Sequence, residues 1–377
     1  MAILGTVEYN GVSLQAIYWY DVASKVPING EISYQDLSTK CGLSVINLQR
    51  ILRFAMIWNR CFTEPRKGFM AHSAASRILV DNPMARSGLG FMFDECWQAF
   101  SHTLDAVRNH GDTEDVTKTG LFKYHASRPE ISRRMAKAKT CFSSAISVSS
   151  QASFLVKNYP WDTAAKVVDV GGAQGHMCVE LAQTYPNLKV VLQDLPDVVD
   201  GIERTLSKNV KDRIEIIGND LLTDQTVQAD AYLFSQIFHN WPEAHCIKIL
   251  RALIPQLKPG ARVICYDHLL PEPRTIHLLR EKAVRYGYNS VSLPVQSGIE
   301  NRDMDMIILP LFNSRERDVD DWANLFQAAD PRFGKPKAWI PEGSNLVIIE
   351  ATWEGGGKGV QELTSVSVLL GRNNTYN

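Results

Sequence analysis

The sequence predicts an α/β fold in which a doubly wound, mostly parallel sheet follows a mostly helical domain. The chain has 377 residues, 45% of them hydrophobic, and is longer than a typical single domain of ~100–200 residues. Apolar residues recur at helical spacing before residue 150, whereas short β-branched runs alternate with helical stretches after it. We therefore expect domains over residues 1–150 and 151–355, and a flexible tail over residues 356–377.

The N-terminal domain begins with an apolar stripe at helical spacing: Leu14, Ile17, Tyr18 and Val22. Residues 32–64 then indicate a helix that turns at Gly42, a second helix, and the start of a hairpin that extends to about residue 72. Such a helix-turn-helix outline often binds DNA, but the second helix carries only Arg50 and Arg53 as cations. We therefore favour a dimerisation module.

Charge and composition exclude several classes of function. Forty Lys+Arg against 41 Asp+Glu give a formal net charge of −1, without the basic surface typical of proteins that bind nucleic acid or anionic membranes. The N-terminus does not match a secretory signal, and no run reaches the ~18 apolar residues of a membrane span. The seven cysteines are scattered, so neither a zinc cluster nor a disulfide framework is predicted. We expect a soluble, cytoplasmic protein without metal that acts on a small molecule.

A glycine turn is the strongest local signal. Residues 167–175 read VVDVGGAQG, a short strand that leads into the turn, and a helix follows. Glycines allow a ligand to approach backbone N–H groups at the start of a helix. The G-G-x-x-G spacing differs from the G-x-G-x-x-G of nicotinamide-binding folds. The next strand ends in Asp194, which can accept hydrogen bonds from ribose hydroxyls, so the pattern predicts an adenosyl ligand.

His239 lies between a predicted strand, AYLFSQI, and a predicted helix, EAHCIKILRAL. Strand ends of a doubly wound sheet face the ligand cleft, which makes His239 a candidate general base. Because the unperturbed pKa of histidine is ~6.5, we expect the ring to be largely neutral at physiological pH.

Most of the chain resembles the class I S-adenosylmethionine-dependent O-methyltransferases of the caffeate and fungal secondary-metabolite type. The resemblance rests on the segments DVGGAQGHMCVELAQTYPNLKVVLQDLPDVV, GNDLL, FHNWPEAHCIKILRALIPQLKPGARVICYD and NSRERDVDDW. It implies a Rossmann-like domain that binds S-adenosyl-L-methionine, an N-terminal winged-helix dimerisation domain and a homodimer. It also implies methylation of a phenolic or enolic hydroxyl of a small molecule.

The same resemblance implies site residues. Cofactor contacts are expected from the glycine turn and the strand ends beside it: Asp169, Gly171, Gly172, Gly175, Asp194, Leu195, Asp220, Leu221 and Ser235. His239 is implied as the base, with Asp267 and Glu316 as carboxylates that hold its tautomer. Asp267 is shorter than the glutamate usual in the family and is expected to need a water or a backbone shift to reach the base. Ala173 replaces a third glycine, and Ser235 replaces a lysine of the plant members.

Substrate contacts are expected from helices over the cleft: Phe122, His125, Met135, Arg302, Asp303 and Met306. Arg302 stands where the family has an apolar residue, and its fork of donors can polarise a carbonyl or hold an enolate. This feature resembles the O-methyltransferase-like pericyclases, which bind the cofactor as a positive electrostatic element without transferring its methyl group. The alternative for Arg302 is an ion pair at the surface. A third hypothesis is a regulator that binds DNA through the helix-turn-helix and senses the cofactor.

Overall fold

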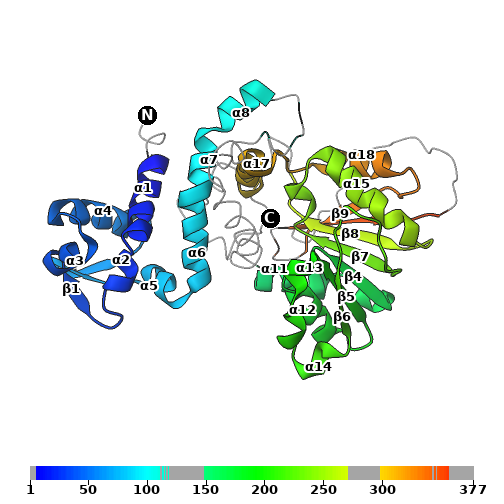
Figure 1. Cartoon of the computed structure of the whole chain (residues 1–377), viewed down its shortest axis with the longest axis horizontal. Coiled ribbons are helices and arrows are strands. Elements are labelled where there is room, and N and C mark those ends of the chain that lie inside the picture. The colour runs from blue at the N-terminus through cyan, green and yellow to red at the C-terminus, as the bar shows by residue number, and fades with distance from the viewer. Residues whose placement is uncertain are drawn as a thin grey trace, which may run out of the picture. The chain divides into compact units, whose positions relative to one another are not determined.

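The structure is a computed structural model that describes residues 6–110, 113, 115, 118, 148–270, 298–341, 344 and 346–355 (Figure 1). These residues form two compact units. Among them, the first unit ends at Gln98 and the second begins at Ala99. No helix in the described ranges is long and apolar enough to cross a membrane.

The first unit consists of helices and a small antiparallel sheet. Its helices are α1 (Thr6–Trp19), α2 (Val22–Lys25), α3 (Tyr34–Cys41), α4 (Val45–Trp58), α5 (Ala74–Asp81), α6 (Pro83–Phe91) and the π-helix η1 (Met92–Cys96), with α7 (Trp97–Ser101) at the division. The strands β1 (Glu31–Ser33), β2 (Thr63–Arg66) and β3 (Phe69–Ala71) pair in the order β1-β3-β2.

Local sequence explains the turn between α3 and α4. The Ser33 hydroxyl accepts a hydrogen bond from the backbone N–H of Asp36 at the start of α3, and Ser44 caps α4 in the same way. Gly42 ends α3 with a φ of 69°, a left-handed conformation that glycine adopts without strain. Leu37 and Leu48 are fully buried between the helices and the sheet. The predicted order of helix, turn, helix and hairpin is therefore present.

The second unit is an α/β layer structure around a seven-stranded sheet. The strands are β4 (Lys166–Val170), β5 (Lys189–Asp194), β6 (Ile214–Gly218), β7 (Ala231–Ser235), β8 (Arg262–Asp267), β9 (Lys337–Trp339) and β10 (Val347–Thr352). Their order is β6-β5-β4-β7-β8-β10-β9. Strands β4 to β8 are parallel, while β10 runs antiparallel to both β8 and β9. The predicted, mostly parallel α/β sheet is confirmed.

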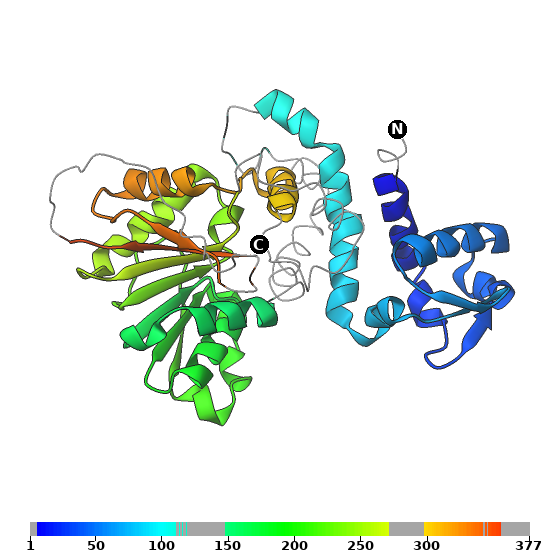
Figure 2. The same cartoon turned by 180° about the vertical axis from the view of Figure 1, so that it is seen from behind.

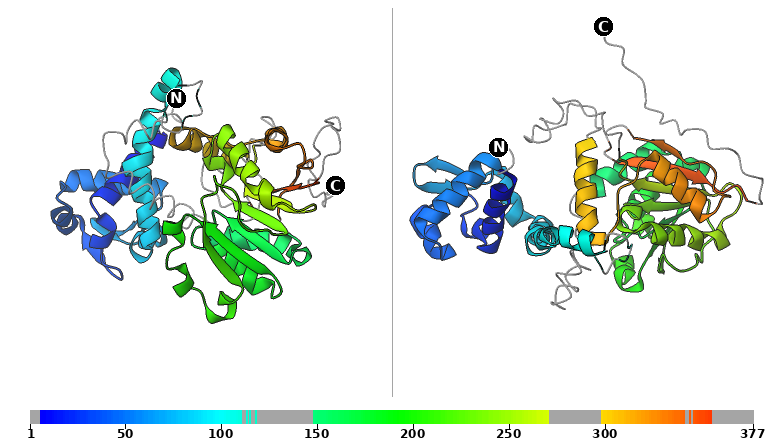
Figure 3. Two further views of the ribbon diagram at one scale, coloured as in Figure 1. Left: turned by 45° about the vertical axis from the view of Figure 1, so that its right-hand side comes forward. Right: turned by 90° about the horizontal axis from the view of Figure 1, so that it is seen from above.

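Helices cover both faces of this sheet (Figures 2 and 3). The helices of the unit are α8 (Thr103–His110), α11 (Val148–Asn158), α12 (His176–Thr184), α13 (Pro196–Val199), α14 (Lys208–Lys211), α15 (Glu243–Leu253), α17 (Gly298–Phe312) and α18 (Val319–Ala329). Short 3-10 helices are η3 (Trp161–Thr163), η4 (Ile202–Arg204), η5 (Phe238–Asn240) and η6 (Ile254–Gln256). Successive strand residues alternate between the two faces, so Leu233 packs with α11 and α12 whereas Phe234 packs with α15 and α18.

Candidate active site

The glycine turn follows the carboxyl end of β4 and is fixed by two hydrogen bonds. The backbone N–H groups of Gly171 and Gly172 donate to the Gln193 carbonyl at 2.7 and 3.1 Å. Gly171 and Gly175 have φ angles of 76° and 74°, which glycine tolerates best. A Cβ on Gly172 would lie 2.5 Å from Leu192 Cδ1. Glycine is therefore required here both by conformation and by close packing.

Asp194, at the end of β5, is held beside this turn. Its Oδ2 accepts a hydrogen bond from the Ala173 N–H at 2.9 Å, and its Oδ1 accepts one from the Leu195 N–H at 2.7 Å. A carboxylate oxygen has a second acceptor site, so both oxygens remain able to accept hydrogen bonds from a diol. This arrangement fits the ribose of an adenosyl group. Ala173 takes the third glycine position with a left-handed φ of 46°.

Asp169 lies beneath the turn and is 1% exposed. Its Oδ2 accepts a hydrogen bond from the Cys178 thiol at 3.2 Å, while its Oδ1 is buried without a hydrogen-bond partner among the described residues. Burial, with the nearby charge of Asp194 adding to it, raises the pKa of Asp169 to about 7. A buried acceptor without a donor fits a ligand that brings one to the turn.

The remaining predicted cofactor residues lie at the same edge of the sheet. The Leu221 side chain packs near Gly171, since a Cβ on that glycine would lie 3.8 Å from Leu221 Cδ2. Asp220 is exposed and caps its own turn, with its Oδ1 accepting from the Leu222 N–H at 2.9 Å. Ser235 is half-buried at the carboxyl end of β7. The side chain of Leu195 is 49% exposed.

His239 is buried in the 3-10 helix η5, directly after β7. Its Nδ1 lies 3.1 Å from Glu316 Oε1 and 3.7 Å from Asp267 Oδ1. An ionised carboxylate can only accept a hydrogen bond, so Nδ1 carries the proton and Nε2 holds the lone pair of the neutral ring. Glu316 therefore fixes the tautomer, while Asp267 lies beyond hydrogen-bond distance of Nδ1. Asp267 Oδ2 instead accepts a long, 3.4 Å hydrogen bond from the His239 backbone N–H.

The protonation state of His239 differs from the sequence-based expectation. Burial by itself lowers the pKa of the ring, but the charges of Asp267 and Glu316 and the hydrogen bond to Glu316 outweigh it and raise the pKa to about 9. The expectation of a largely neutral ring was wrong because it took the unperturbed pKa of histidine, whereas two buried carboxylates beside the ring favour its charged form. At neutral pH the ring is mostly an imidazolium.

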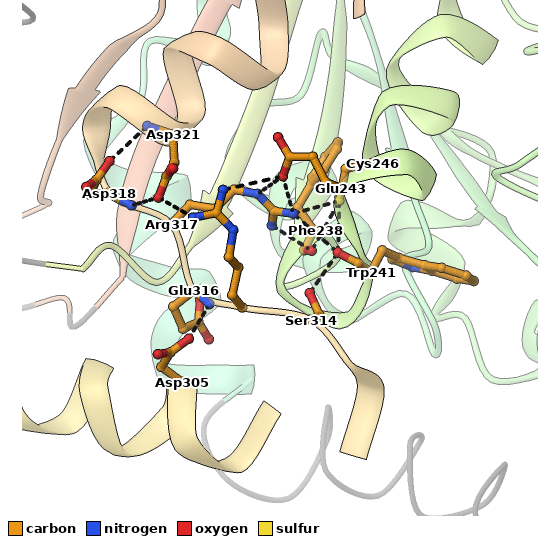
Figure 4. Close-up of polar contacts among 11 residues, drawn as sticks. Phe238, Trp241, Glu243, Cys246, Asp305, Ser314, Glu316, Arg317, Asp318 and Asp321 are labelled. Carbon is orange, nitrogen blue, oxygen red and sulfur yellow. Dashed lines mark hydrogen bonds and ion pairs between the residues drawn. The ribbon is translucent and has the colours of Figure 1, made fainter. Parts of the chain in front are cut away.

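Glu316 is held from the side of α17 (Figure 4). Its side chain is 1% exposed, and its backbone N–H donates to Asp305 Oδ1 at 2.8 Å. Of the substrate residues predicted on α17, Met306 is 63% exposed. Arg302 and Asp303 lie within the helix, but their side chains are outside the described set. Phe122, His125 and Met135 also lie outside the described residues.

Sequence reasoning missed His268, the residue after Asp267. Its ring stacks on that of His239 with centroids 5.7 Å apart and planes 25° apart. In the described ranges, His239, His268 and Glu316 offer ligand atoms within 4.8 Å of one another. The Nδ1 atom of His239 is already directed at Glu316 Oε1, 3.1 Å away, and a protonated ring nitrogen does not bind a metal ion. The only sequence signal of His268 is its adjacency to Asp267.

Comparison with known proteins identifies the family. The family model of the O-methyltransferase domain matches residues 100–330. The chain is 43% identical over 349 residues to the grayanic acid biosynthesis cluster O-methyltransferase of Cladonia grayi, covering 92% of this chain and 72% of the relative. It is 33% identical over 360 residues to a chlorophenol O-methyltransferase of Trichoderma longibrachiatum, covering 91% and 73%. The chain belongs to the O-methyltransferase family.

Solved structures share the fold. The mitomycin 7-O-methyltransferase MmcR superimposes with a TM-score of 0.70 at 20% identity, covering 93% of this chain and 96% of that one. The structure of LepI in complex with S-adenosylmethionine superimposes with a TM-score of 0.68 at 18% identity, covering 91% of this chain and 86% of that one. CalO1, a methyltransferase of calicheamicin biosynthesis solved with S-adenosylhomocysteine, gives 0.65 at 20%, covering 91% and 94%. The family and these ligand-bound neighbours support the predicted cofactor, S-adenosyl-L-methionine.

Proposed function

We propose that this chain is an S-adenosylmethionine-dependent O-methyltransferase that methylates a phenolic or enolic hydroxyl of a small secondary metabolite. His239 is the general base, and Glu316 and Asp267 are its partners. The observation that carries the proposal is the buried 3.1 Å contact between His239 Nδ1 and Glu316 Oε1, which leaves Nε2 as the proton acceptor. The names of related proteins, among them a chlorophenol O-methyltransferase, support a phenolic substrate.

The residues at the glycine turn suit the cofactor. When bound, S-adenosyl-L-methionine supplies an electrophilic methyl group on a positively charged sulfur. Gly171, Gly172 and Gly175 would surround the methionine part, and Asp194 would hold the ribose hydroxyls. The unpaired Oδ1 of Asp169 offers one further acceptor at the turn. Asp220 and Leu221 would border the adenine.

A pKa of about 9 matches His239 to this reaction. A phenol resembles the tyrosine side chain, whose pKa is ~10. The proton therefore passes between two groups, the phenol and His239, whose pKa values are nearly equal. Glu316 and Asp267 stabilise the imidazolium that results. The oxyanion formed beside it is the nucleophile, and holding it near the methyl donor supplies much of the acceleration.

The first unit is proposed as a winged-helix module that binds a second copy of the chain. Large apolar side chains are exposed on α1 and α4: Trp19 (57%), Ile46 (70%), Ile57 (77%) and Trp58 (48%). Exposed apolar groups of this size are typical of interfaces. A monomeric mass from light scattering at micromolar concentration would overturn this assignment. A cytoplasmic location stays a prediction.

A pericyclase on the same fold is the second candidate. Arg302 and Asp303 lie on α17, the helix whose Asp305 holds Glu316, and a solved neighbour with a TM-score of 0.69 at 18% identity is titled a pericyclic reaction enzyme. In that reaction Arg302 and Asp303 would hold the substrate. Arg302→Ala would then reduce activity more than His239→Ala.

One experiment separates the two functions. The protein is incubated with deuteriomethyl-labelled S-adenosylmethionine and a panel of phenols, pyridones and fungal polyketide extracts. The masses of the products are then determined by mass spectrometry. A product that carries the labelled methyl group, absent with His239→Ala, is the expected result. A new product of unchanged mass that still requires the cofactor would overturn methyl transfer and establish the pericyclase.

A further inference from the structure

Arg317 is a charged side chain in the interior, 2% exposed, and directly follows Glu316. Its guanidinium reaches the segment that carries His239 (Figure 4). Nη1 donates to the Phe238 carbonyl at 3.1 Å, and Nη2 donates to the Trp241 carbonyl at 3.3 Å. These two carbonyls flank His239 in the chain: Phe238 precedes it in η5, and Trp241 directly follows the end of η5.

The same guanidinium also meets a carboxylate. Nε and Nη2 of Arg317 lie 3.3 and 3.2 Å from Glu243 Oε2, at the start of α15. The Cys246 sulfur lies 3.2 Å from Nη2. Three nitrogens of a rigid, planar fork thus reach two carbonyls and one carboxylate together. A lysine ammonium is a single point and cannot reproduce this arrangement.

The backbone of Arg317 connects the other parts of the site. The Leu270 N–H donates to the Arg317 carbonyl at 2.9 Å, and Leu269 forms an isolated parallel bridge with Arg317. Both leucines follow Asp267 closely in the chain. Arg317 is therefore bonded to η5 through its side chain and to the extension of β8 through its backbone, while its neighbour Glu316 contacts the ring of His239.

We propose that Arg317 is a positioning residue, which sets the distance from His239 to Glu316 and Asp267 by holding the carbonyls of Phe238 and Trp241. The inference rests on the proposed function, in which His239 is the base. Because Glu316 and Arg317 are adjacent in the chain, one short segment holds both the ring and the backbone of the histidine. Without the guanidinium, η5 is free to move and the contact of Nδ1 with Glu316 lengthens.

The pKa of His239 reports on this geometry. The groups that raise the pKa of the ring are the carboxylates of Asp267 and Glu316 and a backbone hydrogen bond with Gln236, and the ring of His268 stacks on it. Asp305 contacts the Glu316 backbone from α17. Arg317 contacts the Phe238 and Trp241 carbonyls beside His239, and Arg317→Lys keeps its positive charge. A fall of this pKa in Arg317→Lys therefore reports a movement of the ring relative to its carboxylates.

The test is a titration of His239 by imidazole NMR in the full chain, with its signal assigned from His239→Gln. In Arg317→Lys we expect the pKa of His239 to fall by about one unit, a tenfold loss of proton affinity. In the control Glu243→Gln, which removes the charge partner but leaves both carbonyl contacts, we expect a change below about 0.3 unit. An unchanged pKa in folded Arg317→Lys, or an equal fall in Glu243→Gln, overturns the proposal.

A second variant decides the matter if Arg317→Lys does not fold. Arg317→Met combined with Glu243→Gln leaves no unpaired buried charge, and replacing a buried ion pair in this way is often tolerated. The pKa of His239 is again expected to fall, and a wild-type value contradicts the inference. Neither readout requires turnover, so the outcome is independent of whether the protein transfers a methyl group.

Discussion

The Nδ1 atom of His239 lies 3.1 Å from Glu316 Oε1, although the two residues are 77 positions apart in the chain. Both side chains are buried, and the contact joins the turn after β7 to the loop between α17 and α18. The contact fixes the tautomer of the candidate base, and the charges of Asp267 and Glu316 together raise its proton affinity.

Glu316→Gln tests this contact. The amide keeps the shape of the side chain but removes its charge, so the pKa of His239 falls. We expect kcat to fall about 10- to 100-fold, the usual effect of losing a partner that orients a functional histidine. KM for the phenol and the affinity for the cofactor stay close to wild type. A variant with wild-type kcat across the pH range would remove Glu316 from the machinery.

The pH dependence of turnover follows from the raised pKa. Only the neutral ring accepts a proton, and the pKa of His239 in the free protein is about 9. We expect kcat/KM to increase about tenfold for each pH unit up to that value and then to level off. Steady-state rates between pH 6 and 10 measure this, on a substrate that does not itself ionise in the range. A plateau that begins near the ordinary histidine value of ~6.5 contradicts the assignment.

Stability has the opposite pH dependence. The pKa of His239 is raised in the folded state relative to ~6.5 in the unfolded chain. Its stabilising contribution is therefore complete below pH ~6.5 and is lost as the pH rises through about 9. The free energy of unfolding, measured by thermal denaturation, should decrease by up to about 3 kcal/mol between these two pH values. His239→Gln should lack this component, and an identical pH dependence in that variant would refute it.

The sequence predicted the sheet because each strand is a local, β-branched run bounded by turns. The predicted run AKVVDV, residues 165–170, contains β4, and the predicted run ARVICYDHLL, residues 261–270, contains β8. The three-residue strand β9 was missed, since it is short and is defined mainly by pairing with β10. His268 and Arg317 were missed for a related reason: their roles depend on which distant groups fold against them, and although Arg317 lies in the segment NSRERDVDDW, that segment does not reveal its contacts.

Asp169→Asn separates stability from binding. The pKa of the buried Asp169 is raised to about 7, far above ~3.9 in the unfolded chain. The loss of folding stability caused by this buried carboxyl group is absent below pH ~3.9, grows as the pH rises, and is complete above about pH 7. We expect the asparagine variant to be more stable than wild type at pH 8, by up to about 4 kcal/mol, and equally stable near pH 4. Cofactor affinity, measured by calorimetry, should fall in the same variant.

Gly172→Ala tests the close packing of the glycine turn. A Cβ there would lie 2.5 Å from Leu192 Cδ1 and 2.6 Å from Asp169 Oδ2, so the turn must shift away from its present course. Gly88→Ala is the matched control, because this glycine also lacks a positive φ and a Cβ on it would meet nothing within 4 Å. Gly88 lies within α6, where alanine is favoured over glycine by about 0.5–1 kcal/mol. We expect Gly172→Ala to weaken cofactor binding at least about tenfold, or 1.4 kcal/mol, while Gly88→Ala binds as wild type. Equal affinities in calorimetry would show that the turn does not need a glycine at position 172 to hold the cofactor.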